Sequence, residues 1–438
     1  MLRIRRLGQL GVAAVAATML VACGSSSPSG GGGGTGGGGG AGALEGRGPI
    51  TMATGKDTSG NLQHQIDTWN ASHPTEKATV IELPESADGQ RQAMIQNAQT
   101  KSDAYTILNL DVVWTAEFAA NKWVLELPKD QFDVAQFLPP TVDSASYRDK
   151  LYGIPSASDS GLLYYRKDLL TKASVDGPPT TWAELTSDCQ KVQALPEGKK
   201  ISCYAGQFDK YEGLTCNFAE AVNGAGGVIV GDDGKPNVDT PEAKAGLNNL
   251  VQAFKSGLIP KAAITYKEEE GRRAFQAGEL IFHRQWPYQY ALANKTDGSS
   301  KVAGKFAVAA LPGLNGPGVG TLGGHNLAIS AFAKNKASAA DFIKFLTGTE
   351  AMKANVLATS QAPTRTALYD DPDLVKAYPY LAILKQGILT AKPRPKAVKY
   401  GDVTAAIEDD AYAALTGAKS VDDALSNMQS KLQSIIGS

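Results

Sequence analysis

Short apolar segments alternate with amphipathic ones along most of the chain. Runs of β-branched and other apolar residues predict strands at 78–83, 105–110, 161–165, 280–283 and 326–330. Polar or amphipathic stretches predict helices at 90–101, 182–193, 274–278 and 338–346. Strands that alternate with helices in this way are typical of α/β folds, so we expect mainly parallel sheets.

The C-terminal segment shows the clearest helical spacing. Val421, Leu425, Met428, Leu432 and Ile435 recur at intervals of four and three, which places them on one face of a helix. We expect this apolar stripe to pack on the body of the protein. The alternative is a docking helix for a partner.

The first 45 residues follow a different pattern. Three arginines precede an apolar run at 10–22, and small residues lead up to Cys23. A spanning helix needs about 20 apolar residues, so a lipoprotein signal peptide at 1–22 is favoured over a retained membrane anchor. Cys23 would then carry the lipid anchor. Residues 23–45 are rich in Gly and Ser and predict a flexible tether.

Charge and length restrict the kind of partner. The part of the chain from about residue 44 to residue 438 is long enough for one large or two ordinary domains. Lys and Arg total 43 against 44 for Asp and Glu, and neither sign forms a long block. We therefore expect neither nucleic acid nor an anionic membrane surface as the main partner.

Three cysteines remain after Cys23, namely Cys189, Cys203 and Cys216. Outside the cytosol two of them can form a disulfide, and a bond between Cys189 and Cys203 closes the shortest loop. Spacing alone leaves the pairing open.

The motifs of metal, cofactor and catalytic sites are missing from the sequence. It contains no CxxC, P-loop, GxSxG or HExxH, and its four histidines are isolated from one another. Residues 318–323 match GxGxxG but precede a predicted strand, whereas a dinucleotide site needs a helix there. The acidic run 268–270 is interpreted as a solvated helix end. We expect no metal and no cofactor.

Candidate binding residues lie where predicted strands end, which is where open α/β sheets bind ligands. Asp111 follows the strand at 105–110, although a helix N-cap is its simplest alternative role. Trp286 follows the strand at 280–283 and begins a cluster of three aromatic residues at 286–290, although it could belong to the core. A flat aromatic face flanked by carboxylate and amide groups is what a sugar needs.

The chain from about residue 49 resembles the solute-binding lipoproteins of ABC importers for disaccharides. The resemblance is strongest to actinobacterial trehalose-binding and trehalose/maltose-binding proteins. The residues that carry it are 110–118, Trp123, 162–170, Glu212–Gly213 ahead of Gly226–Gly227, Trp286–Pro287, 323–328 and 392–395. Asp159 departs from the pattern, since relatives often have Asn there.

This resemblance implies a two-lobed, periplasmic-binding-protein-like α/β fold with an interlobe hinge and a ligand cleft. Lobe 1 would comprise 46–153 with about 304–349, and lobe 2 about 154–303 with 350–438. The ligand-binding residues that it implies are Lys56, Asp57, Asp111, Asp159, Glu212, Trp286, Gly324, Asn326 and Arg394.

Some of these residues have structural alternatives. Glu212 or Arg394 could belong to an interlobe ion pair, and the glycines at 323–324 could serve only a tight turn. Two prolines flank Arg394 and stiffen its segment, which suits a planar guanidinium aimed into a cleft. We favour ligand contact for Arg394.

The expected function is binding without catalysis. A neutral disaccharide such as trehalose or maltose would be held by lobe closure and passed to the membrane subunits of an ABC importer. The protein would be a monomer, anchored through Cys23 on the extracytoplasmic face of the cell membrane. The alternatives are an extracellular glycoside hydrolase that uses Asp111, Asp159 and Glu212, and an adhesive surface lipoprotein.

Overall fold

The computed structural model describes residues 44–436. The predicted signal peptide, Cys23 and nearly all of the predicted tether lie outside the described residues. No helix between residues 44 and 436 combines the length and the apolar character that crossing a membrane requires.

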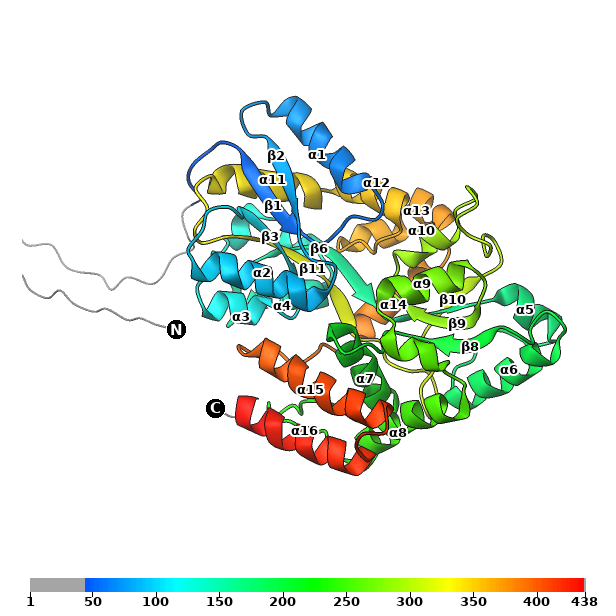
Figure 1. Ribbon diagram of the computed structural model, residues 1–438. Helices are drawn as coiled ribbons and strands as arrows, with labels where there is room; N and C mark the ends of the chain where they lie inside the picture. Colours follow the sequence, from blue (N-terminus) through cyan, green and yellow to red (C-terminus); the bar gives the residue numbers. More distant parts are fainter. Residues whose placement is uncertain (1–43, 437–438) are drawn as a thin grey trace, which may run out of the picture. The chain divides into compact units, whose positions relative to one another are not determined.

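The first sheet has five strands in the order β2-β1-β3-β11-β6 (Figure 1). Its strands are β1 (Ile50–Thr54), β2 (Ala78–Glu82), β3 (Ile107–Asp111), β6 (Ile154–Ser160) and β11 (Leu322–Ile329). The helices associated with it are α1 (Asn61–Ser72), α2 (Ala87–Gln99), α3 (Thr115–Ala120), α4 (Pro139–Ser144) and α11 (Lys336–Thr347). A small hairpin of β4 (Ser146–Tyr147) and β5 (Lys150–Leu151) contacts α3 and α4.

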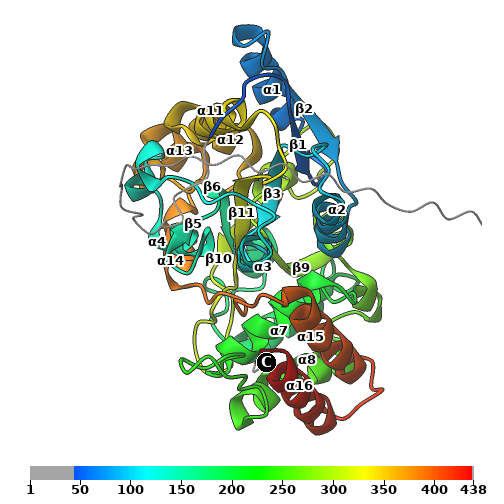
Figure 2. The ribbon, with the colours of Figure 1, turned by 90° about the vertical axis from the view of Figure 1, so that its left-hand side faces the viewer.

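The second sheet has four strands in the order β10-β7-β9-β8. Its strands are β7 (Leu162–Tyr165), β8 (Ser202–Ala205), β9 (Leu280–Gln285) and β10 (Ala307–Ala309). The helices on this side are α5 (Lys167–Lys172), α6 (Trp182–Ala194), α7 (Glu212–Gly224), α8 (Pro241–Ser256), α9 (Glu268–Gln276), α10 (Gln289–Ala293), α15 (Tyr400–Leu415) and α16 (Val421–Ile436). Figure 2 shows α15 and α16 beside α7 and α8, with which they are in contact.

The sheets are mixed in direction, so the expectation of mainly parallel sheets is wrong. β1 runs parallel to β2 and β3, and β8 runs parallel to β9. However, β11 is antiparallel to both β3 and β6, and β7 is antiparallel to both β9 and β10. The reason is that β6, β7, β10 and β11 flank the points where the chain passes between the sheets, and they are not joined by simple βαβ crossovers.

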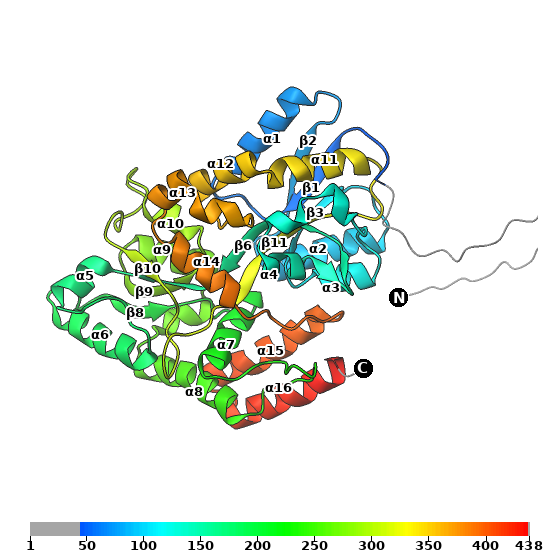
Figure 3. The same ribbon diagram turned by 180° about the vertical axis from the view of Figure 1, so that it is seen from behind.

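The chain passes between the two sheets at 160–162 and again at 309–322, slightly later than the predicted lobe boundaries at about 154 and 304. After α11 come α12 (Thr349–Thr359), α13 (Pro372–Ala377) and α14 (Leu381–Thr390), visible in Figure 3. α12 contacts α1 and α11, and α14 contacts β6. The prediction placed all of 350–438 in lobe 2; within this segment α15 and α16 pack with α7 and α8, whereas α12 contacts α10 as well as the helices of the first sheet.

A local sequence signal explains where α6 begins. The side chain of Thr181 accepts a hydrogen bond from the Glu184 backbone, and the Glu184 carboxylate accepts one from the Thr181 backbone, forming a capping box that begins α6. Single 3₁₀ turns lie at η1 (Lys129–Gln131), η2 (Val134–Gln136), η3 (Lys261–Thr265) and η4 (Thr366–Asp370).

The apolar stripe of α16 packs in the core, as predicted. Leu425, Met428 and Leu432 are fully buried, and α16 contacts both α8 and α15. The alternative of a free docking face is therefore excluded for these three side chains.

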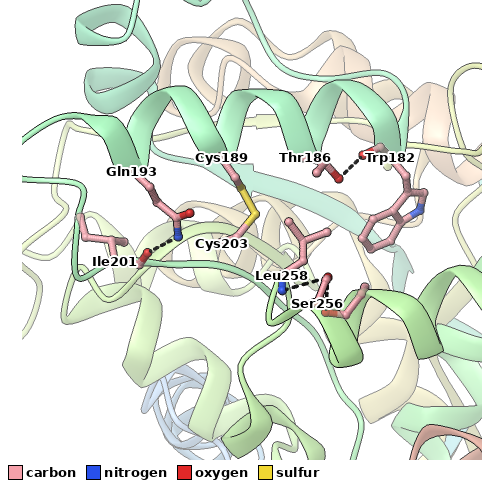
Figure 4. The surroundings of a disulfide bond; sticks show 9 residues. Trp182, Thr186, Cys189, Gln193, Ile201, Cys203, Ser256 and Leu258 are labelled. Atoms are coloured by element: carbon pink, nitrogen blue, oxygen red, sulfur yellow. Dashed lines mark hydrogen bonds between the residues drawn. A yellow bond between two sulfur atoms is a disulfide. The ribbon is translucent and has the colours of Figure 1, made fainter.

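A disulfide joins α6 to β8 and resolves the cysteine pairing. Cys189 and Cys203 are bonded, with their Cα atoms 5.6 Å apart (Figure 4). Cys216 is a buried free thiol. Nearby, the Gln193 side chain donates to the Ile201 carbonyl at 2.9 Å and ties the same two segments together. The disulfide that forms is therefore the one that closes the shortest loop.

Loss of this disulfide should lower the free energy of unfolding by about 3 kcal/mol, because the bond restricts a loop of roughly 15 residues in the unfolded chain. The measurement is the urea midpoint of the protein with and without a reductant. A Cys189→Ser/Cys203→Ser variant serves as the control and should be insensitive to reductant. Equal midpoints for the oxidised and reduced protein would contradict the expectation.

Candidate ligand-binding site

A cavity of about 800 Å³ lies between elements of the two sheets. Its walls include most of the sequence-predicted binding residues, namely Lys56, Asp57, Asp111, Asp159, Glu212, Trp286, Gly324 and Arg394. Its size falls within the usual range for small-molecule sites. The remaining prediction, Asn326, is buried next to the cavity wall and not in it.

Arg394 connects the two sides of the cavity through ion pairs. Its guanidinium donates to Asp111, at the end of β3, at 2.8 Å and also pairs with Glu212, the first residue of α7. The Tyr400 hydroxyl donates to the same Glu212 carboxylate. The side chain of Arg394 is only 2% exposed, so the ion-pair alternative holds together with a place on the cavity wall.

Burial and neighbouring charges both shift the pKa values of Glu212 and Arg394. Burial raises the pKa of Glu212, and the negative charge of Asp111 raises it further, while Arg394 lowers it. Burial alone would lower the pKa of Arg394, but the nearby acidic groups, Asp111 first, hold it well above its ordinary value. The guanidinium therefore stays charged and compensates both carboxylates.

The first loop of the cavity is organised by Asp57. Its carboxylate accepts hydrogen bonds from the backbone N–H groups of Ser59 at 2.8 Å and Leu62 at 2.9 Å, at the start of α1. Lys56 beside it is exposed at the rim of the cavity. Asp111 likewise accepts from the Val113 backbone at 3.2 Å, which is a local turn ahead of α3 and not a helix N-cap.

The indole of Trp286 reaches the cavity from the end of β9. The guanidinium carbon of Arg284 lies 3.8 Å from the centroid of the indole ring. Arg284 is fully buried and is held by Glu220 at 2.5 and 2.8 Å and by Gln207 at 2.9 Å. A Cβ at Gly323 would lie 2.9 Å from the indole Cζ3, so the absence of a side chain at this position leaves room for the ring. One face of the indole is therefore covered by Arg284.

Gly324 and Asn326 have backbone or internal roles in β11. Gly324 has a φ of +115°, and a Cβ there would collide with the carbonyl oxygen of Ala157, so only glycine fits. The amide of Asn326 donates to the hydroxyls of Thr115 at 3.3 Å and Ser144 at 3.2 Å. Asn326 therefore joins β11 to α3 and α4 behind the cavity.

Asp159 presents its carboxylate to the cavity from β6. This carboxylate makes no hydrogen bond or ion pair with any residue in the described range 44–436, whereas Asp111 and Glu212 are both engaged by Arg394. Burial, followed by the like charge of Asp111, raises the pKa of Asp159 to about 7. Its carboxylate is thus available to a ligand.

The raised pKa of Asp159 should make stability depend on pH in a defined direction. Between its ordinary pKa of 3.8 and about 7, the unfolded chain loses this proton while the folded protein keeps it. The free energy of unfolding should therefore fall as pH rises through that window, by at most about 1.4 kcal/mol per pH unit. Urea midpoints from pH 4.5 to 8 should fall less steeply for Asp159→Asn than for the parent. Parallel profiles would contradict the assignment.

Several wall residues were not among the predicted binding residues, although Tyr288 belongs to the aromatic cluster at 286–290. They are Tyr211, Lys267, Glu268, Glu269 and Tyr288. The Tyr288 hydroxyl donates to Glu269 at 2.8 Å, and both Glu268 and Glu269 are partly buried. The interpretation of 268–270 as a solvated helix end is therefore wrong for these two residues, because the start of α9 faces the cavity. The aromatic residue at 288 was the only available signal.

One acidic cluster adjoins the cavity. Carboxylate oxygens of Asp88, Glu212 and Glu408 lie within 4.8 Å of one another. Glu212 is already paired with Arg394, Asp88 accepts from the Glu212 backbone at 3.3 Å, and Glu408 accepts from Thr404 at 2.8 Å. Each of the three acids thus has a protein partner.

The model of the bacterial extracellular solute-binding protein family matches residues 65–383. The chain belongs to this family. Extracellular solute-binding proteins act outside the cytoplasm, and the cavity between the two sheets is the candidate solute site of this one.

Similar proteins agree with the assignment to the solute-binding family. The chain is 35% identical to a probable ABC transporter-binding protein of Deinococcus radiodurans, over 85% of this chain and 89% of that one. The structure of maltose-bound MalE3 of T. maritima matches with a TM-score of 0.84 and 35% identity, over 88% of this chain and 99% of that one. A galactooligosaccharide-binding protein of Bacillus subtilis is 24% identical, over 80% of each chain. The predicted two-lobed, periplasmic-binding-protein-like α/β fold is confirmed.

Proposed function

We propose that this solute-binding protein holds a neutral disaccharide such as trehalose or maltose between its two lobes and delivers it to an ABC importer. The observation that carries the proposal is the indole of Trp286 on a cavity wall that also presents the carboxylate of Asp159 and the guanidinium of Arg394. A pyranose ring stacks its C–H bonds on an aromatic face, and its hydroxyls bind planar charged groups.

The relatives support a saccharide ligand. MalE3 of T. maritima was determined with maltose bound, and it is similar to this chain over most of both lengths. The proposed binding residues are Lys56, Asp57, Asp111, Asp159, Glu212, Trp286, Gly324 and Arg394, with Asn326 in a supporting position.

Binding would act by lobe closure. Asp111 and Asp159 belong to strands of the first sheet, whereas Glu212 and Trp286 belong to elements beside the second. A ligand that contacts both sets at once stabilises the closed arrangement through contacts that the open one lacks. The membrane subunits of the importer would then recognise the closed protein.

Anchoring follows from the N-terminal sequence. We infer that Cys23 carries lipid on the extracytoplasmic face of the cell membrane, that residues 23–45 form the tether, and that the protein is a monomer with no enzymatic activity. Mass spectrometry of the membrane-extracted protein would detect the acyl chains. Release of a Cys23→Ala variant into the medium would support the role of Cys23 as the anchor.

Thermal-shift measurements with trehalose, maltose, sucrose and longer glucosides test the ligand class. A sugar present at about 100 times its Kd should stabilise the protein by about 2.7 kcal/mol and raise the melting temperature. Absence of a shift with every sugar would refute the proposal. A parallel glucose assay separates the hydrolase alternative, because glucose release from trehalose or maltose would show catalysis.

A further inference from the structure

The carbonyl oxygen of Pro287 is surrounded by hydroxyl groups. Tyr164 donates to it at 3.1 Å and Ser360 at 2.9 Å, while the Tyr380 hydroxyl lies 3.5 Å away and is closer to the Ser360 carbonyl, at 3.2 Å. The Tyr164 hydroxyl lies equally close, at 3.1 Å, to the carbonyl oxygen of Trp286. The backbone carbonyls of Trp286 and of the residue that follows it are thus both held.

The residues that carry these hydroxyls are buried, so water cannot take the place of their hydrogen-bond partners. Tyr164 is 0% exposed, Ser360 1% and Tyr380 4%. Ser360 also accepts from the Ala291 backbone at 2.9 Å, so its oxygen is used as donor and acceptor. A buried hydroxyl without a partner is strongly unfavourable, which makes this geometry resistant to change.

The three groups come from separate parts of the fold. Tyr164 lies in β7 of the second sheet, Ser360 directly follows α12, and Tyr380 directly precedes α14. α12 packs on α1 and α11, and α14 packs on β6 of the first sheet. The segment that carries Trp286 is therefore tied to elements associated with both sheets.

The N-terminal side of Trp286 is held as well. Its backbone N–H donates to the Gln285 side chain at 3.0 Å, and that side chain donates to the Glu268 carbonyl at 2.9 Å. Pro287 has a φ angle fixed by its ring. With the backbone fixed on both sides, the remaining freedom of the indole is its side-chain rotation, which the stacked guanidinium of Arg284 restricts.

We propose that the buried hydroxyls around Pro287 are positioning groups that hold the indole of Trp286 in its ligand-binding orientation before a sugar arrives. The proposal rests on the proposed function for the identity of the ligand. An indole that is already ordered loses no further conformational entropy on binding, so its preorganisation strengthens affinity. None of the three residues needs to touch the sugar.

The test compares Tyr164→Phe and Ser360→Gly with the parent. Phe keeps the ring of Tyr164 in the core, and Gly suits the φ of 56° at position 360. Tyr369→Phe is the matched control, because Tyr369 is also buried and donates to a carbonyl, that of Pro363, at 2.8 Å. Calorimetric titration with maltose or trehalose gives Kd, and acrylamide quenching of Trp286 gives its mobility without ligand. The Trp286 signal is the difference between each variant and the same variant carrying Trp286→Phe.

Tyr164→Phe and Ser360→Gly should each raise Kd about 5- to 10-fold and make Trp286 more accessible to acrylamide, whereas Tyr369→Phe should change neither. Unchanged quenching and Kd in both variants, or equal changes in the Tyr369→Phe control, would overturn the proposal. If the parent binds no sugar, the proposed function fails separately, and the quenching comparison still decides whether the hydroxyls hold the indole.

Discussion

Replacing Arg394 with alanine should lower the free energy of unfolding by about 3 kcal/mol or more and abolish sugar binding. The side chains of Asp111 and Glu212 are only 14% and 5% exposed, and both pair with this guanidinium. Without it, two close carboxylates would remain in the cavity wall with no compensating charge. A purely ligand-contacting arginine would instead leave the melt of the free protein unchanged.

Urea denaturation and calorimetric titration of Arg394→Ala measure the two effects separately. Lys396→Ala is the matched control, because Lys396 lies two residues away and pairs with Asp143 at the surface, where the two side chains are 43% and 68% exposed. Exposed pairs contribute about 0–1 kcal/mol, so this variant should unfold and bind nearly like the parent. Similar denaturation midpoints for Arg394→Ala and the parent would contradict the buried-pair interpretation.

Elements whose signals are local could be predicted from the sequence. The strand predicted at 78–83 is β2, and the apolar stripe at 421–435 is α16, because each depends on a periodicity within one segment. The helix predicted at 274–278 begins six residues earlier, at Glu268. Acidic residues favour a helix N-terminus, so the run at 268–270 is the start of α9.

Strand direction and the packing of the later helices could not be predicted. The antiparallel pairing of β11 with β3 depends on where the chain returns from the second sheet, which is a long-range property. The association of α12 with α1 has the same origin. No local pattern contains this information.

The proposed binding residues can be divided in the same way into those that local signals predict and those that they do not. Asp111 ends β3 and Trp286 follows β9, so the rule that ligands bind where strands end predicted both. Asn326 was placed on the wrong side of β11, since side chains alternate along a strand and the cavity-facing neighbour is His325. The role of Arg284 could not be predicted, because its contacts with the indole and with Glu220 exist only in the folded chain.

Replacing Trp286 with alanine should weaken sugar binding by about 100-fold or more, which is the effect expected for a buried aromatic anchor of an interface. The ring offers the flat apolar surface of the cavity wall, and its opposite face is already covered by Arg284. Arg284 keeps its bonds to Glu220 and Gln207 in the variant, so the fold should persist with a modest loss of stability. Trp286→Phe keeps a smaller ring and should bind with intermediate affinity.

Trp182→Ala separates this effect from a general loss of tryptophan packing. Trp182 stacks edge-on against Tyr204, with ring centroids 4.9 Å apart, and is not part of the cavity wall. Its loss should lower the melting temperature but leave the calorimetric Kd unchanged, whereas Trp286→Ala should raise Kd strongly with only a modest loss of stability. Because both variants replace a tryptophan with alanine, a large rise in Kd in Trp286→Ala alone would locate the sugar at the indole of Trp286. Full affinity in Trp286→Ala would instead place the sugar elsewhere in the cavity.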